Sequence, residues 1–392
     1  MTSTRGLDSA ELLDRASTLV PVLRRHALWQ EENRRLHEET IQALTDSGLL
    51  RMRMPAHHGG GESDLRTLVD VLAELARGDG STSWTVAVWA ISTWMVGMFP
   101  DDVQDEVFAT PDVRVSGILS PSAMATPTDG GVLLTGRWAF NSGATQSHWN
   151  TNAAVMPNAE GELEPIMTLI PLSDLAIIDD WHTAGLRGSG SVTTAAENLF
   201  VPQERVLPLG PVLGGRHRSV RNADSPMYRA PFMPTAATTV GATALGLAKA
   251  AKEAFFERLP GRKITYTSYD DQSTAPLTHL QVGEAVTKID EAEFHARRAA
   301  AMVDEKGAAE EWTVEERARV RLDVGAVCLR AKEAVDVLNT ASGGSSIYRD
   351  VPIQRIERDV QTLNLHAIMH PNTNLELYGR ILCGLEPNTS FL

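Results

Sequence analysis

Asn141-Ser142-Gly143 is the first place in the chain where the residue types suggest a turn that approaches a ligand. It ends the run 136–144, in which Trp138 to Phe140 reads as part of a strand. Small polar side chains after a strand let the backbone and a hydroxyl come close to a bound molecule. A serine in an ordinary hairpin end would give the same pattern, so both readings stand at this point.

A second turn with similar residue types spans residues 185–191, where glycines and serines surround Arg187. Arg187 is the only cation in the turn, and successive backbone N–H groups from Gly188 to Ser191 are suited to an anion. The turn is not a dinucleotide fingerprint, because the GxGxxG spacing is absent and no strand–helix frame surrounds it.

The histidines and cysteines do not suggest a metal site. His366 and His370 apart, the nine other histidines include no HxxxH pair and no two-histidine-plus-carboxylate set close in sequence. Cys328 and Cys383 lie in apolar helical contexts without CxxC spacing. We therefore expect no metal, no disulfide framework and a reducing, cytoplasmic location.

Composition narrows the classes of partner. The chain has 392 residues, 43% of them hydrophobic and 22% charged, which is typical of a soluble protein of two or three domains. Its net charge of -14 argues against nucleic acid or an anionic membrane as the main partner. The polar N-terminus lacks a signal peptide, and the most apolar segment, residues 84–99, is too short and interrupted for a comfortable membrane span.

The elements that must position these turns change in kind along the chain. Helical periodicity runs from residue 8 to 110, with Ser9 as a possible cap of the first helix and a second helix predicted over residues 31–46. From residue 113 the period changes to two, which predicts short strands in a small barrel or sandwich. The predicted strands are residues 113–118, 132–140, 152–155, 166–171, 176–178 and 193–201.

The remainder of the chain is predicted to be a loop followed by helices. Residues 208–234 lack periodicity and read as a long surface loop or lid, whose Arg216, Arg218 and Arg221 would touch an anionic ligand or simply face solvent. Helical patterns return over residues 235–392 and imply an antiparallel bundle. They include a polar helical stretch over residues 361–370, which ends at Pro371.

With its helical, β and helical regions in this order, the chain resembles the acyl-CoA dehydrogenase superfamily. More narrowly, it is similar to the reduced-flavin-dependent monooxygenases that share this fold. The resemblance rests on three stretches: residues 136–143, residues 183–191 followed by 198–202, and Gly343-Gly344 with residues 352–355 and Arg358-Asp359. It implies an α+β fold with a helical domain at 1–112, a β-barrel at 113–207, a lid at 208–234 and a four-helix bundle at 235–392.

Two departures separate the chain from the dehydrogenases. Their catalytic glutamate lies about eight residues beyond the Arg-Asp pair, but here that position is Ala367, and no carboxylate occurs between Asp359 and Glu376. The base for proton abstraction beside a thioester is therefore missing. The first bundle hairpin reads Thr265 to Asp270 in place of the arginine and Phe-Gly that help to hold FAD, which suits a reduced flavin delivered by a separate reductase.

The resemblance also assigns residues to the flavin. Ser142 matches the family serine beside the flavin ring, and Arg187 is the candidate contact for a flavin phosphate or ring carbonyl. The set of residues implied to bind the cofactor is Trp138, Phe140, Ser142, Thr168, Arg187, Gly188, Ser189, Ser191, Gly343 and Gly344.

His366 is the candidate acid or base, because it occupies the helix position at which these monooxygenases place a histidine. Imidazole, with an ordinary pKa near ~6.5, can exchange a proton at neutral pH. His370 would share its helix face, and a hydrogen-bonded core histidine is the alternative. Trp89 stands where the family sometimes has another histidine, so we expect Trp89, Ser120 and His370 to line the substrate pocket, although tryptophans at helical spacing usually form core.

The expected activity is oxygenation. Reduced flavin, FADH2 or FMNH2, reacts with O2 in such enzymes to give a C4a-hydroperoxide that hydroxylates a phenol, an indole or a polyketide-like ring. N- or S-oxygenation is the variant within the class, an acyl-CoA dehydrogenase is disfavoured, and a non-catalytic flavin-binding bundle is the rival outside it. The expected partners are a small aromatic substrate and a separate flavin reductase, and the expected assembly is a homotetramer.

Overall fold

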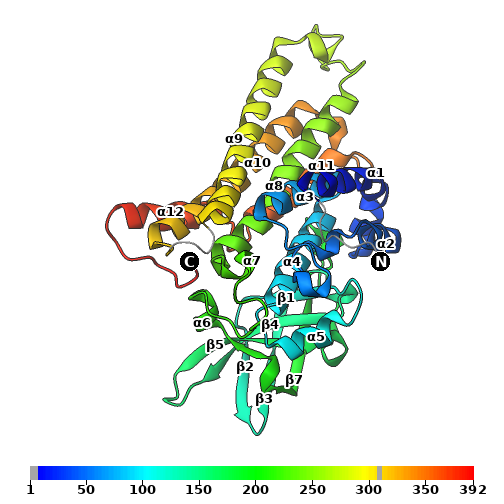
Figure 1. The fold of residues 1–392 in the computed structure, drawn as a ribbon. Coiled ribbons are helices and arrows are strands. Elements are labelled where there is room, and N and C mark those ends of the chain that lie inside the picture. Colours follow the sequence, from blue (N-terminus) through cyan, green and yellow to red (C-terminus); the bar gives the residue numbers. More distant parts are fainter. Residues whose placement is uncertain (1–7, 307–310) are drawn as a thin grey trace.

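The computed structural model describes residues 8–306 and 311–392. The chain forms helices, then a β-sheet, then a helical bundle (Figure 1). In Figure 1 the sheet lies at one end of the molecule, the bundle helices α8, α9 and α10 extend to the other, and α1–α4 lie between them on one side. The helical, β and helical order expected from the sequence is confirmed.

The N-terminal helices differ from the prediction at their ends. They are α1 (Ser9–Asn33), α2 (Glu38–Ser47), α3 (Leu65–Gly78), α4 (Gly80–Val96) and α5 (Asp101–Phe108). The N-cap of α1 is Asp8 and not Ser9, because the Asp8 carboxylate accepts the N–H of Glu11. The second helix begins at Glu38 and not at residue 31, because α1 continues until Arg34 turns left-handed at φ 55°.

The β region is one mixed sheet with the strand order β6-β7-β3-β2-β4-β5-β8, and β1 pairs with β4. Six strands match the predicted ones, and β2 and β8 were not predicted. Within the described residues, no ladder joins the end strands β6 and β8, so the curved sheet is not a hydrogen-bonded closed barrel. The strands are β1 (Val115–Ile118), β2 (Ala123–Thr128), β3 (Gly131–Asn141), β4 (Trp149–Pro157), β5 (Leu163–Pro171), β6 (Ala176–Ile178), β7 (Val192–Pro202) and β8 (Val206–Pro208).

The segment predicted as a loop or lid, residues 208–234, is anchored to the molecule. It contains α6 (Leu209–Leu213) and α7 (Pro226–Arg229), and Tyr228 is buried. Arg221 pairs with Asp105, and Arg218 donates to backbone carbonyls, so these two arginines hold the segment in place. The three arginines of the segment are exposed, and contact of Arg216, Arg218 and Arg221 with an anionic ligand stays a prediction.

The bundle consists of α8 (Phe232–Arg258), α9 (Pro276–Lys306), α10 (Val314–Ala341), α11 (Pro352–Asn364) and α12 (Pro371–Leu382). The helix predicted over residues 361–370 is wrong in its second half. α11 ends at Asn364, and the chain passes through a non-helical turn before His370 precedes α12.

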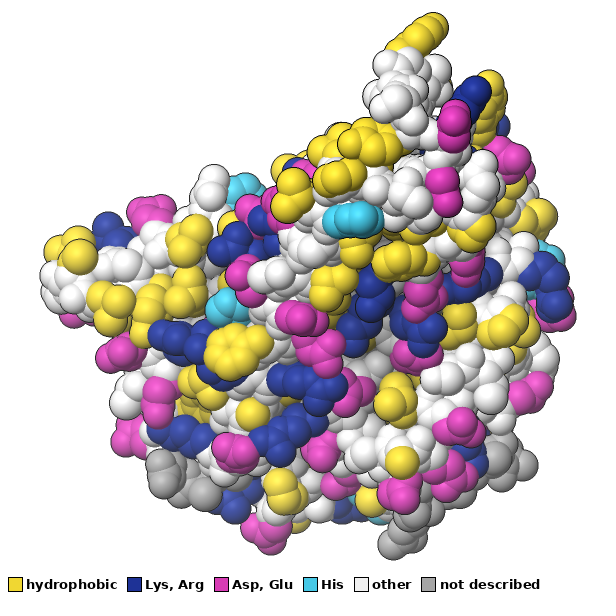
Figure 2. All heavy atoms as spheres, turned by 90° about the horizontal axis from the view of Figure 1, so that it is seen from above, with side chains coloured by type: hydrophobic (Ala, Val, Ile, Leu, Met, Phe, Trp, Pro, Cys, Tyr) yellow, Lys and Arg dark blue, Asp and Glu magenta, His cyan; other side chains and the backbone are white. Residues whose placement is uncertain are grey.

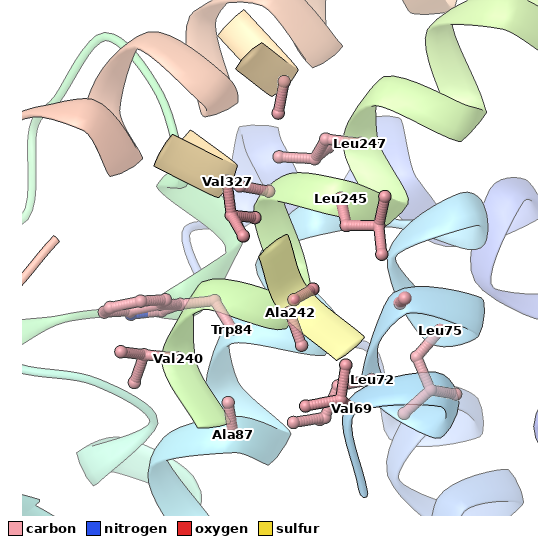
Figure 3. Close-up of a cluster of buried hydrophobic side chains, with 14 of the residues drawn as sticks. Val69, Leu72, Leu75, Trp84, Ala87, Val240, Ala242, Leu245, Leu247 and Val327 are labelled. Atoms are coloured by element: carbon pink, nitrogen blue, oxygen red, sulfur yellow. The ribbon is translucent and has the colours of Figure 1, made fainter. Parts of the chain in front are cut away.

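One hydrophobic core joins the N-terminal helices to the bundle. In Figure 3, Leu72 and Val69 of α3 lie against Ala242 of α8, while Trp84 of α4 lies beside Val240. The proposed boundaries 1–112, 113–207, 208–234 and 235–392 thus divide the chain by secondary structure, while the first and last regions share a core, and these boundaries stay a prediction. None of the described helices has the length and apolar content of a membrane span.

Candidate active site

The turn at Ser142 is shaped by an irregularity in β3. Between Trp138 and Asn141, β3 has one residue more than its partner β7, which is a bulge. Phe140 in this bulge adopts φ 63°, which is rare for a bulky side chain, and the residue is 69% exposed. Its edge faces Trp181, with ring centroids 5.9 Å apart. Strain of this kind is commonly found at functional sites.

Gly143 fits this turn only because it lacks a side chain. Its φ is 69°, and a Cβ atom would lie 2.7 Å from both Thr85 and Trp89 of α4. Its N–H donates to the carbonyl of Ser189 at 2.8 Å. The first candidate turn therefore packs directly on both α4 and the second candidate turn.

The hydroxyls of Ser142, Ser191 and Ser189 form a chain with a fixed direction. Ser189 donates to the Leu186 carbonyl at 2.7 Å, so the 2.7 Å contact between Ser189 and Ser191 must be donated by Ser191. Ser191 then has no proton left for Ser142, so Ser142 donates across their 2.7 Å contact. The indole N–H of Trp84 donates to Ser142 at 2.8 Å. We call this chain, from Trp84 to Leu186, the serine relay.

The ring of Trp84 also contacts His366, which connects the serine relay to that side chain. The two rings meet edge to face, with centroids 5.2 Å apart and planes at 68°. His366 is partly buried in the turn after α11, and its Nδ1 accepts the N–H of Ile368 at 3.3 Å. Burial, together with nearby Arg321, lowers the pKa of His366 to about 4. The imidazole is therefore neutral at physiological pH, and because Nδ1 accepts the Ile368 N–H, Nε2 carries the ring proton.

The helical position assumed for His366 and His370 is corrected. Both lie in or after the turn that follows α11, so they do not share a helix face. His370 is the N-cap residue of α12, and its Nδ1 is buried with no hydrogen-bond partner among the described residues.

The second candidate turn is held by the C-terminal Arg-Asp pair. The Asp359 carboxylate accepts the N–H of Leu186 at 2.6 Å, and Arg358 donates to the Ala184 carbonyl at 2.7 Å. A Cβ atom on Gly185 would lie 2.1 Å from the Arg358 carbonyl, so this approach needs glycine. The 3-10 turn Arg187–Ser189 follows, and Gly188 faces Ser81 of α4.

Arg187 is oriented by the protein itself. Its Nε donates to the Glu31 carbonyl at 3.2 Å and its Nη1 to the Thr183 carbonyl at 3.0 Å. Its assignment to a flavin phosphate or carbonyl stays a prediction, resting on the donors that remain on the guanidinium.

Other predicted residues lie apart from the serine relay. Trp138 and Thr168 are fully buried in the sheet, where they donate to the carbonyls of Ala153 and Asn152. Ser120 is exposed after β1. Gly343 and Gly344 form an exposed turn after α10, beside Arg262.

Trp89, predicted to line the substrate pocket, is buried. Its indole N–H donates to Ser147 at 2.9 Å, and Arg114 lies over its ring. It therefore contributes a wall behind the Ser142 turn.

Sequence reasoning did not single out Trp181, and it considered Trp84 only as one of several tryptophans that line a substrate pocket or belong to the core. Their roles depend on contacts 41 and 58 positions away, as differences in residue number between Trp181 and Phe140 and between Trp84 and Ser142 show. Local patterns carry no signal for such contacts.

Among the described residues, His26, His37 and Glu39 form a set whose ligand atoms lie within 4.8 Å of one another. The two rings are stacked at 9°, so their nitrogens do not converge on a point. Arg25 already pairs with Glu39, and His37 caps α2 through Nδ1. This arrangement describes a capped helix elbow, and we assign no metal to it.

The relay and the bulge fit a flavin. An exposed aromatic ring at a strained position can stack against the flavin, and Ser142 retains one lone pair after accepting the Trp84 N–H. His366 places a neutral imidazole on the other side of Trp84. Phe140 and Ser142 are the groups that would hold the cofactor, since within the 188–191 turn the N–H groups of Ser189 and Gly190 already donate to the carbonyls of Leu186 and Arg187.

Comparison with known proteins identifies the family. Residues 16–111 match the acyl-CoA dehydrogenase N-terminal domain, and residues 238–371 match its C-terminal domain. The chain is 31% identical to a pigment production hydroxylase of Rhodococcus sp., over 97% of this chain and 98% of that protein. It is 29% identical to the oxygenase component of the FADH(2)-dependent resorcinol hydroxylase of Rhizobium sp., over 97% and 96% of the two chains.

A solved structure agrees with this result. XiaF from Streptomyces sp., in complex with FADH2 and glycerol, matches with a TM-score of 0.92 and 31% identity over 98% of both chains. The chain belongs to the acyl-CoA dehydrogenase family. Within that family it is a flavin-dependent monooxygenase, as its sequence resemblance implied.

Proposed function

We propose that this protein is the oxygenase component of a two-component system that hydroxylates a small aromatic ring. A separate reductase supplies the reduced flavin, as the words "oxygenase component" in the name of the resorcinol hydroxylase suggest. When bound, reduced flavin activates O2 and supplies the oxygen atom.

The direction of the serine relay carries this proposal. The proton of Ser142 is committed to Ser191, so toward a ligand Ser142 can only accept a hydrogen bond. Reduced flavin has an N–H at N5, whereas oxidised flavin has a bare nitrogen there. An acceptor at this position therefore favours the reduced cofactor over the oxidised one, as expected for a protein that receives its flavin already reduced.

His366 supplies the proton acceptor on the substrate side. A neutral imidazole that takes the proton of a phenol O–H or an indole N–H raises the electron density of the ring that is to be oxygenated. The low pKa of His366 keeps the ring neutral at physiological pH, and it would accept the proton at Nδ1 by giving up its 3.3 Å contact with the Ile368 N–H. N- or S-oxygenation needs no such acceptor, so His366 favours ring hydroxylation.

A dehydrogenase is not supported. The carboxylate nearest in sequence to the expected base position, Asp359, is buried and bound to the N–H of Leu186.

The two cysteines, Cys328 and Cys383, are unpaired, which fits the cytoplasmic location that we propose.

We further propose a homotetramer. Large apolar side chains lie exposed along the bundle, and Figure 2 shows hydrophobic side chains gathered on this face. Monomers rarely expose so much apolar surface, so second copies of the chain are the expected cover. The exposed residues are Phe256, Tyr266, Leu277, Leu280, Phe294, Ile347 and Tyr348.

Oxygen isotope incorporation tests the activity. The protein is supplied with FADH2 or FMNH2, ¹⁸O2 and a panel of phenols and indoles, and the products are analysed by mass spectrometry. We expect one ¹⁸O atom in a hydroxylated ring. Products that carry only oxygen from water, or that are desaturated without oxygen, would refute the proposal.

A further inference from the structure

Two buried carboxylates support the serine relay, one at each of its ends. Asp79 is the N-cap of α4, the helix that carries Trp84, the first donor of the relay. Asp359 accepts the N–H of Leu186, whose carbonyl is the last acceptor. Both carboxylates are buried, at 4% and 3% exposure.

The two carboxylates both lie at the start of α4 and line the same cavity. A Cβ atom on Gly80, next to Asp79, would lie 3.1 Å from Asp359 Oδ2. The other contacts of Asp79 are all from hydrogen-bond donors, since Thr82 and Gln30 donate to its Oδ2 at 2.7–2.9 Å. Asp359 therefore lies beside the first residue of the helix, close enough to Asp79 for the two charges to repel.

Burial and the neighbouring Asp79 raise the pKa of Asp359 to about 7, from an ordinary value of 3.8. Burial also raises the pKa of Asp79. The cations that oppose these shifts are Arg355 and Arg358 of α11. Arg358 pairs with Glu31 at 2.5 Å, and Arg355 makes no hydrogen bond to either acid within the described residues.

A cavity of about 80 Å³ beside the pair gives it access to water. The charged side chains of its lining are Arg24, Arg77, Arg355, Glu257 and the two acids, and the other lining residues are glycine or apolar. A volume of this size holds several water molecules. A proton can therefore reach the acids without opening the fold.

We propose that Asp79 and Asp359 are positioning residues that share one proton and align the two ends of the serine relay for reduced flavin. While the pair holds the proton, α4 and the Leu186 turn stay together. Loss of that proton places two negative charges across Gly80, which separates the Trp84 end from the Leu186 end and weakens the alignment of Ser142. This inference rests on the proposed binding of reduced flavin.

The test measures the dissociation constant of FADH2 under anaerobic conditions across the pH range on both sides of neutrality. Asp359→Asn keeps an acceptor for Leu186 and removes the charge, so any titration of the flavin itself is common to both proteins. We expect the ratio of the wild-type to the Asp359→Asn dissociation constant to rise about tenfold as the pH increases through the pKa, equivalent to about 1.4 kcal/mol.

Two other variants sharpen the result. Asp79→Asn keeps the helix cap and removes the like charge, so the pH dependence should move to lower pH. Asp304→Asn is the matched control, because Asp304 is also a carboxylate that binds the first N–H groups of a helix, at Leu65 and Arg66, and has a raised pKa, but its contacts are with α3. The ratio of the wild-type to the Asp304→Asn dissociation constant for FADH2 should stay constant with pH.

The outcomes separate this inference from the function. If the wild-type protein binds reduced flavin but the ratio of the wild-type to the Asp359→Asn dissociation constant does not change with pH, the shared proton is refuted and the proposed function stands. If wild-type protein does not bind reduced flavin at any pH, the proposed function fails. Should Asp359→Asn not fold, a wild-type pH dependence that Asp79→Asn leaves in place would also overturn the inference.

Discussion

Ser142, Trp84 and His366 are the residues to which we assign the proposed chemistry of this protein. Trp84 contacts both of the others, through its indole N–H on one side and its ring on the other. A single buried tryptophan thus sets the position of the Ser142 hydroxyl, which we propose faces the flavin, relative to the His366 imidazole, which we propose faces the substrate.

The first prediction at this scale concerns His366. His366→Ala should leave the affinity for reduced flavin nearly unchanged and lower hydroxylation by about 10²–10⁴-fold, because only the proton transfer is lost. Oxygen uptake should continue without product, which oxygen-electrode and product assays measure together. Wild-type hydroxylation by the variant would make His366 a packing residue.

The pH profile of the wild-type protein gives a second measure of the same residue. His366 must be neutral to accept a proton, and its folded pKa is lowered to about 4. The kcat/KM for hydroxylation should therefore stay level, as far as His366 is concerned, down through the ordinary histidine range and fall only as the pH approaches about 4. A fall near ~6.5 that His366→Ala removes would contradict the lowered pKa.

The second prediction at this scale concerns the direction of the relay. Ser191→Ala removes the acceptor for the Ser142 proton, so Ser142 becomes free to donate. The preference for reduced over oxidised flavin should then narrow by about tenfold, equivalent to about one hydrogen bond. Titrations of both redox forms measure it, with Ser122→Ala, an exposed serine bound to the Arg137 carbonyl, as the control. An unchanged preference would show that the relay does not orient Ser142.

At the scale of elements, the Ser142 turn and the 185–191 turn pack between α4, α11 and the sheet. Gly143, which contacts α4, gives the sharpest test of this packing. Gly143→Ala must adopt φ 69° and place a Cβ atom 2.7 Å from Trp89, so we expect a loss of stability of about 2–3 kcal/mol and loss of flavin binding.

The matched control is Gly161→Ala. Gly161 has φ 85° but nothing lies within 4 Å of its Cβ position, so it carries the same backbone strain without the clash. Thermal unfolding of both variants separates the loss of stability caused by backbone strain from the loss caused by the clash with α4. Equal destabilisation, with flavin binding intact in Gly143→Ala, would mean that the turn does not need close contact with α4.

Elements with a strong period were predictable from the sequence, and contacts between them were not. The apolar repeat of α3 and the alternation of β3 follow from the side chains of each segment alone. The end of α11 was not predictable, because Leu365 to Met369 have ordinary helical residue types and the chain leaves the helix there only in the folded structure.

The site was predictable to the same extent. Ser142, Phe140 and the 185–191 turn carry local signals of glycine and small polar residues, whereas Trp138 and Thr168 are fully buried in the sheet. The relay joins residues that are 49 and 58 positions apart, so only the fold reveals it.

At the scale of the whole molecule, the exposed apolar side of the bundle predicts assembly. Light scattering at micromolar concentration should give a mass about four times the 42.6 kDa chain. Leu280→Arg, at a side chain that is 73% exposed on α9, should dissociate the assembly, while Leu163→Arg, 56% exposed on β5, should not. A wild-type monomer would contradict the proposal.

An oxygenase must change how reduced flavin reacts with O2, so the reaction of the bound reduced flavin with O2 is the most direct test. Anaerobic protein with one equivalent of FADH2 or FMNH2 is mixed with oxygenated buffer in a stopped-flow spectrometer, without substrate. We predict a transient spectrum that is neither reduced nor oxidised flavin and that outlasts any seen with free flavin. Reoxidation in one step, at the rate of the free cofactor, would contradict the assignment of this chain as an oxygenase.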